Sequence, residues 1–188
     1  YSKILLPALL LFAAVASAAE TATLDHAKYT EALKAFRQGK ASALPALTDP
    51  AVEIRRAAID DLRERLVDEP TAPLAGQVGA VLGKVDLATA RLLLAALAEA
   101  KATTTAAQVA ALAGQKDSPL RAEAALALAE IGGAKAVPIL AELAKDEALN
   151  EDSIAALAKT AGPGVTDAFN AGILDPKLDP ASRTALIK

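Results

Sequence analysis

Few side chains in this sequence can take part in acid–base, nucleophilic or metal chemistry. His26 is the single histidine among the 188 residues, and the chain has no cysteine. A catalytic or metal-bound histidine needs partners at fixed geometry, and neither a second imidazole nor a thiolate exists to supply them. The pair Asp25-His26 stands where a helix is expected to begin, so we interpret it as a polar first turn.

Two pairs of adjacent carboxylates, Asp60-Asp61 and Glu151-Asp152, are the next candidates for acid–base chemistry. Neighbouring positions on a helix point to different sides, so these pairs are poorly placed to act on one substrate. The glycine-containing stretches match no phosphate-binding motif. We therefore expect a non-enzymatic protein with no catalytic, cofactor-binding or metal-binding residue.

The composition predicts helices throughout. Hydrophobic residues make up 53% of the chain and aromatic residues only 3%. Ala and Leu dominate the apolar content and are the best apolar helix formers, whereas the residues that favour strands are few. The net charge of −3 is spread along the chain, without the concentrated basic surface that nucleic acid requires. We expect one all-α domain and no nucleic-acid partner.

The first 20 residues have the three parts of a secretory signal peptide. Lys3 is followed by an apolar run and then by the small-residue site Ala16-Ser17-Ala18. Two interpretations remain open: the segment is cleaved after Ala18, or it is retained as a membrane anchor that contacts the bilayer through residues 4–19. Both place the main domain, residues 21–188, outside the cytoplasm. It is then periplasmic, either soluble or anchored to the inner membrane.

Proline, glycine and aspartate divide the rest of the chain into short helical segments. Their length and their short connections are typical of antiparallel helix pairs. Asp49 is a suitable N-cap, and Pro50 follows it at a position where the missing N–H costs nothing. We expect helices over residues 24–38, 42–47, 49–67, 73–82, 87–100, 105–113, 119–131, 134–144, 151–159, 164–171 and 180–187.

Two of these segments share a pattern in which an aspartate precedes an arginine by a few residues. The pairs are Asp49 with Arg55 and Asp117 with Arg121, and 66 positions separate the two arginines. That separation holds two units of 33, a period typical of an α-solenoid. We expect these four residues to be structural. Each aspartate would cap the following helix, and each arginine would reach an aspartate or a carbonyl of a neighbouring repeat.

The second copy resembles a HEAT repeat, in particular the short bacterial HEAT-like repeats of phycobilisome lyase-type proteins. The first half of another copy matches at Asp49, Ile54, Arg55, Ala58 and Leu62. The full copy matches the family pattern at Asp117, Arg121, Ala124, Leu128, Ile131, Gly132, Val137, Pro138, Leu140, Leu143 and Asp146. The resemblance implies an α-solenoid of stacked antiparallel helix pairs that works by binding other proteins.

The resemblance and the N-terminal segment together indicate a scaffold or adaptor in the bacterial envelope. Its partners would be proteins of the envelope or of a membrane complex, and with a retained anchor it would be an accessory subunit docked on that complex. An assembly factor or lyase-like helper that handles a prosthetic group is an alternative, which would need convergent polar groups in a pocket. A structural element that packs in an array is another.

Tyr29 and Phe36 are the residues that we would place in an interface, because aromatic side chains are few here and anchor interfaces well. Together with Leu33 they recur at helical spacing on one face of the first expected helix. The same spacing also fits packing in a core, so both roles remain open for these two side chains.

Overall fold

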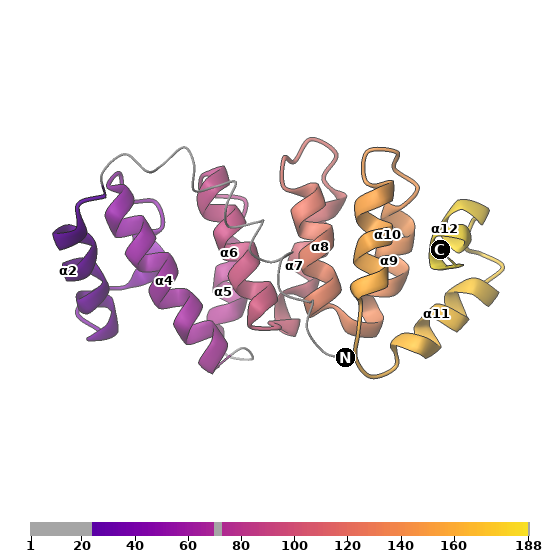
Figure 1. Ribbon diagram of the computed structural model, residues 1–188, viewed down its shortest axis with the longest axis horizontal. Coiled ribbons are helices and arrows are strands. Elements are labelled where there is room, and N and C mark those ends of the chain that lie inside the picture. The colour runs from indigo at the N-terminus through magenta and orange to yellow at the C-terminus, as the bar shows by residue number, and fades with distance from the viewer. Residues whose placement is uncertain (1–23, 70–72, 188) are drawn as a thin grey trace, which may run out of the picture. The chain divides into compact units, whose positions relative to one another are not determined.

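A computed structural model describes residues 24–69 and 73–187 of the chain, and all regular structure in these ranges is helical (Figure 1). The all-α prediction is therefore confirmed for the described residues. The expected signal or anchor segment, residues 1–20, and its membrane contact through residues 4–19 lie outside them. None of the helices in the described ranges combines the length and the apolar content that a bilayer crossing requires.

Each expected helix has a counterpart in the structure, and the observed ends differ from the expected ones by at most three residues. Two short 3₁₀ helices, η1 (Thr103–Thr105) and η2 (Gly133–Lys135), precede α7 and α9. The α-helices are α2 (His26–Arg37), α3 (Ala43–Ala46), α4 (Val52–Asp68), α5 (Pro73–Val81), α6 (Leu87–Glu99), α7 (Ala106–Gly114), α8 (Arg121–Ile131), α9 (Ala136–Leu143), α10 (Asn150–Lys159), α11 (Val165–Leu174) and α12 (Pro180–Ile187).

The chain forms two compact units, and the division between them falls inside α4, after Leu62. The first unit contains α2, α3 and the N-terminal part of α4. The Asp25 carboxylate caps α2 by accepting hydrogen bonds from the main-chain N–H groups of Ala27 and Lys28, both at 3.1 Å. The buried apolar side chains of this unit are Phe36, Ala43, Leu47, Ala57, Ala58, Ile59 and Leu62.

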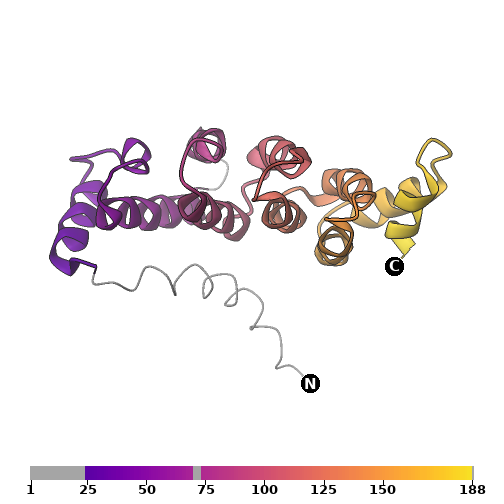
Figure 2. The ribbon, with the colours of Figure 1, turned by 90° about the horizontal axis from the view of Figure 1, so that it is seen from above.

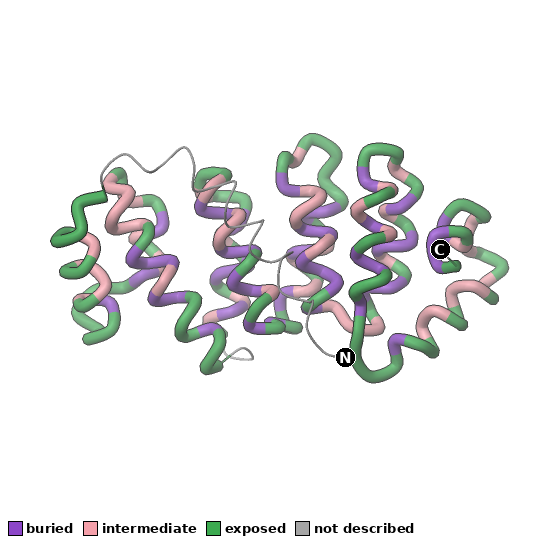
Figure 3. Tube along the Cα trace, viewed as in Figure 1, coloured by how far each residue is buried: buried purple, intermediate pink, exposed green. Residues whose placement is uncertain are grey.

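The second unit, residues 63–187, arranges its helices in two rows (Figures 1 and 2). In one row α6, α8 and α10 lie side by side, and in the other α7 lies between α5 and α9. The rows pack on each other chiefly through α7 with α8 and α9 with α10, and α11 and α12 pack on α9. Figure 3 shows that buried positions alternate with exposed ones along these helices, as expected for helices with one face in a core.

Small side chains let the rows approach closely. Fully buried alanines occur on each of α6, α8, α9 and α10, interleaved with leucines that fill the remaining space. Fully buried alanines in these helices are Ala90, Ala124, Ala125, Ala136, Ala141 and Ala156. The scarcity of aromatic residues in the sequence therefore corresponds to a core of alanine and aliphatic side chains.

At the turn from α8 to α9 the backbone lies so close to its neighbours that a side chain at Gly132 would collide with them. A Cβ atom on Gly132 would lie 2.6 Å from the Cβ of Ala136 and 2.8 Å from the carbonyl oxygen of Leu128. Gly133 follows with a φ of 49°, in the left-handed region that favours glycine. The Gly-Gly pair therefore fits this turn for two different reasons, close approach at the first residue and backbone conformation at the second.

Candidate functional site

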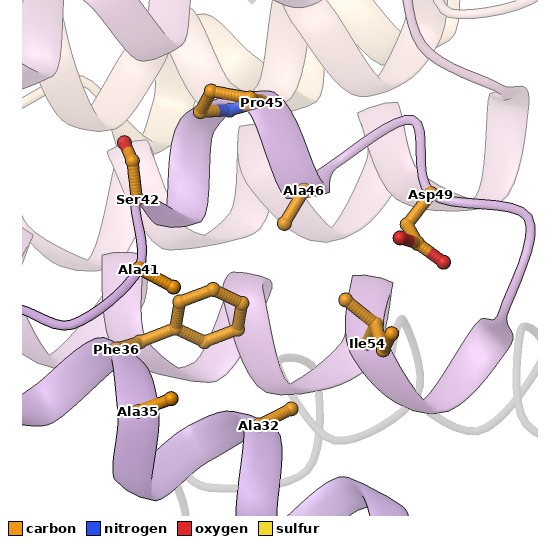
Figure 4. A pocket seen from close by; sticks show the side chains of 9 residues that line it. All are labelled: Ala32, Ala35, Phe36, Ala41, Ser42, Pro45, Ala46, Asp49 and Ile54. Atoms are coloured by element: carbon orange, nitrogen blue, oxygen red, sulfur yellow. The ribbon is translucent and has the colours of Figure 1, made fainter.

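A hollow on the first unit, which we call the Phe36 groove, lies between α2, α3 and the start of α4 (Figure 4). Its volume is about 430 Å³. It is lined by Ala32, Ala35, Phe36, Ala41, Ser42, Pro45, Ala46, Asp49 and Ile54. Most of this lining consists of hydrocarbon, and the polar groups belong to Ser42 and Asp49.

The groove exists because α2 presents alanines where larger side chains would fill the space. Ala32 shares a helix face with both Ala35 and Phe36, since it lies three and four positions before them, and all three line the groove. The Phe36 side chain is 8% exposed and its ring points into the groove, with Ile54 on the facing segment (Figure 4). The ring is thus held by packing and forms a rigid part of the wall.

The two predicted interface aromatics have different surroundings. Phe36 lines the groove, whereas Tyr29 is not part of its lining and instead binds α4. The Tyr29 hydroxyl donates a hydrogen bond of 2.8 Å to Asp60 Oδ2, and its ring stacks on His26 with 6.1 Å between centroids. Burial and the acceptor carboxylate of Asp60 raise the pKa of Tyr29 above its ordinary value. Tyr29 therefore ties α2 to α4 inside the first unit.

The first predicted Asp/Arg pair lies at the edge of the groove. Asp49 Oδ1 accepts a hydrogen bond of 2.8 Å from the main-chain N–H of Ala51, just before α4 begins. Arg55 Nη1 donates to the main-chain oxygens of Asp49 and Pro50, at 2.7 Å and 3.2 Å. Both side chains thus hold the loop that leads into α4.

In the second predicted pair, Asp117 with Arg121, the arginine makes the expected kind of contact and the aspartate does not cap α8. Arg121 is 12% exposed, and its Nη2 donates to Asp146 Oδ2 at 2.6 Å while its Nε donates to the Ala113 carbonyl at 3.2 Å. Just before α8, the main-chain N–H of Leu120 donates a hydrogen bond of 3.2 Å to Ser118 Oγ. Asp117 instead lines a second hollow of about 550 Å³, between residues 82–90 and 112–120.

Four polar bonds that join alternate helices along the chain have similar sequence separations. The bonded residues are 31 to 36 positions apart, close to the expected period of 33. Each bond lies within one of the two units. They are Tyr29 to Asp60 at 2.8 Å, Arg63 to Glu99 at 2.6 Å, Arg91 to Glu123 at 2.7 Å, and Gln108 to the Gly76 carbonyl at 3.4 Å.

An ion cluster fixes the last helix of the second unit. Lys145 Nζ lies 2.6 Å from Asp179 Oδ2 and 2.6 Å from Glu142 Oε2. The hydrogen bond from Lys145 is the main reason that the pKa of Asp179 is far below its ordinary value of 3.8. The same contacts, first that with Asp179, raise the pKa of Lys145. Asp179 also caps α12 through the N–H groups of Ala181 and Ser182.

Nothing in the described ranges brings together three side chains that could hold a metal ion. Neither the models of known protein families nor the curated proteins match this sequence. The function is therefore argued from the arrangement of the residues themselves.

Proposed function

We propose that this chain is a non-enzymatic scaffold or adaptor that binds other proteins, built as an α-solenoid of HEAT-like helix pairs. The rows of helices in the second unit and the polar bonds one period apart support the repeat interpretation. The N-terminal sequence supports a position in the bacterial envelope, where the partners would be envelope proteins or subunits of a membrane complex.

The observation that carries the binding role is the Phe36 groove. It is concave and mostly apolar, and an aromatic ring forms part of its wall, which are properties shared by sites that receive anchor side chains of a partner. Most of the polar side-chain contacts described above, such as Tyr29 with Asp60 and Arg91 with Glu123, hold helices together, whereas the groove is an open apolar surface.

Site-specific photo-crosslinking in native membranes and periplasm tests this role. A photoreactive residue at Ala41, exposed on the groove, should give a discrete protein adduct, and one at Gln38, exposed but outside the lining, should not. The adduct should disappear when Ala35→Leu fills the groove and persist in Ala27→Leu, an exposed substitution of the same size on the same helix. Adducts that are unaffected by Ala35→Leu would overturn the assignment of the groove.

Intact-mass measurement with fractionation tests the location. A mass without residues 1–18 in the soluble periplasmic fraction would indicate a free adaptor. A full-length mass in the membrane fraction would indicate an anchored subunit. Recovery in the cytoplasm would contradict the envelope assignment.

A further inference from the structure

The lining of the Phe36 groove restricts the chemistry of whatever occupies it. Seven of its nine residues are apolar, and they come from α2, α3, α4 and the loop between α2 and α3. Asp49 is the single ionisable residue of the lining. An occupant must therefore match a hydrocarbon wall and also accommodate one carboxylate.

The Asp49 carboxylate lies in the lining of the groove, within reach of an occupant. Figure 4 shows its oxygens turned toward the side of the groove where Ile54 lies. Among the described residues its side chain accepts one hydrogen bond, from the N–H of Ala51 to Oδ1. The nearby Arg55 guanidinium donates to the main-chain oxygens of Asp49 and Pro50. The other carboxylate oxygen, Oδ2, accepts no hydrogen bond from the described residues.

Covering this groove with hydrocarbon alone would strip water from the Asp49 carboxylate, whose side chain accepts one hydrogen bond from the described residues. Such burial is costly unless a donor or an opposite charge replaces the water. An acidic occupant would add repulsion to that cost, whereas a lysine or arginine supplies both the charge and the hydrogen bond.

We infer that the Phe36 groove binds a partner segment that inserts a large aliphatic side chain against Phe36 and Ile54 and sets a lysine or arginine against Asp49. This inference rests on the proposed function of the groove as a protein-binding site. The inference adds which segments the groove selects. They are aliphatic and basic, and acidic or purely apolar segments should not bind.

A library of displayed random peptides, selected on the full chain and counter-selected on Ala35→Leu, tests the inference. Peptides that survive both steps should combine a large aliphatic residue with a lysine or arginine nearby. For the best peptide, Asp49→Asn should weaken binding at least about tenfold, since one partner of a desolvated charge pair is lost. The asparagine oxygen can still accept from Ala51, so the loop before α4 is retained. Asp68→Asn, an exposed carboxylate outside the groove, controls for net charge.

A variant of the selected peptide separates the contact with Asp49 from general electrostatic attraction. Replacing its basic residue with glutamine should weaken binding to the wild-type protein but cause no further loss on Asp49→Asn. Peptides that need the open groove yet bind Asp49→Asn as well as wild type would overturn this inference and leave the proposed binding role standing. A selection in which no peptide distinguishes wild type from Ala35→Leu would instead count against the groove itself.

Discussion

Replacing Gly132 with alanine is expected to destabilise the protein by overcrowding the α8–α9 turn. The added Cβ would lie 2.6 Å from the Cβ of Ala136 and 2.8 Å from the carbonyl oxygen of Leu128. Ordinary contacts between such atoms begin near 3.4 Å. Both neighbours belong to rigid helices, because Leu128 is buried in α8 and Ala136 is buried at the start of α9. The turn must therefore open by several tenths of an ångström.

The cost of that opening is the cost of overpacking a core, about 1–3 kcal/mol. The backbone of Gly132 adds no further strain, since its φ of −89° suits any residue. For a protein of this size, 1 kcal/mol lowers the melting temperature by roughly 2–4 °C. Urea unfolding followed by circular dichroism at 222 nm gives the free energy of unfolding directly.

Two other glycines serve as controls that separate crowding from backbone conformation. An alanine at Gly133 meets no atom within 4 Å but must adopt a φ of 49°, so it should cost about 1–2 kcal/mol without crowding. An alanine at Gly114, in the last turn of α7, meets no atom within 4 Å and has no unusual φ, so it should be neutral or stabilise slightly. If Gly132→Ala were as stable as Gly114→Ala, the described closeness of the turn would be refuted.

Three further predictions concern polar groups. Asp86→Ala should cost about 1 kcal/mol of unfolding free energy, because Asp86 caps α6 by accepting from the Thr89 N–H at 2.9 Å, and Asp86→Ser should restore most of it. Ser153→Ala should stabilise by up to about 1 kcal/mol in the same assay, since its buried hydroxyl has no hydrogen-bond partner among the described residues; a destabilised variant would contradict this. Because Lys145 lowers the folded-state pKa of Asp179, the stability from this pair is present above pH 3.8 and is lost as the pH falls below it. Acid titration of the unfolding midpoint should therefore be less steep in Lys145→Met than in wild type.

The helices could be predicted from the sequence because the residues that start and stop them act locally. Pro73 and Pro180 stand at the first residue of α5 and α12, as expected of a residue without an N–H. The sequence predicts the start of α4 three residues too early, since Asp49 binds the N–H of Ala51 in the loop before the helix. The sequence also predicts the end of α11 three residues too early, because Gly172 remains helical and packs on Leu186 of α12.

The groove could not be predicted because it depends on missing volume rather than on a recognisable side chain. Its space is left by alanines from α2, the following loop and α3, and no pattern in one segment shows that they meet. The sequence does indicate Phe36, whose ring lines that space. It does so because aromatic residues are few in this chain, and not because the position of the groove could be predicted. Likewise, only the three-dimensional contacts show that Ser118 bonds the N–H at the start of α8 while Asp117 lines the second hollow.

The neighbour-to-neighbour packing of the second unit has a consequence for how it folds. Helices that pack there are mostly adjacent or one element apart, and the polar bonds that join them span no more than 36 positions. Little loop-closure entropy opposes such local contacts, so folding should be fast and should start at any adjacent pair. Unfolding should then proceed inward from the end. Amide hydrogens of α12 should exchange with solvent first and those of α8, which packs on α6, α7 and α10, should exchange last.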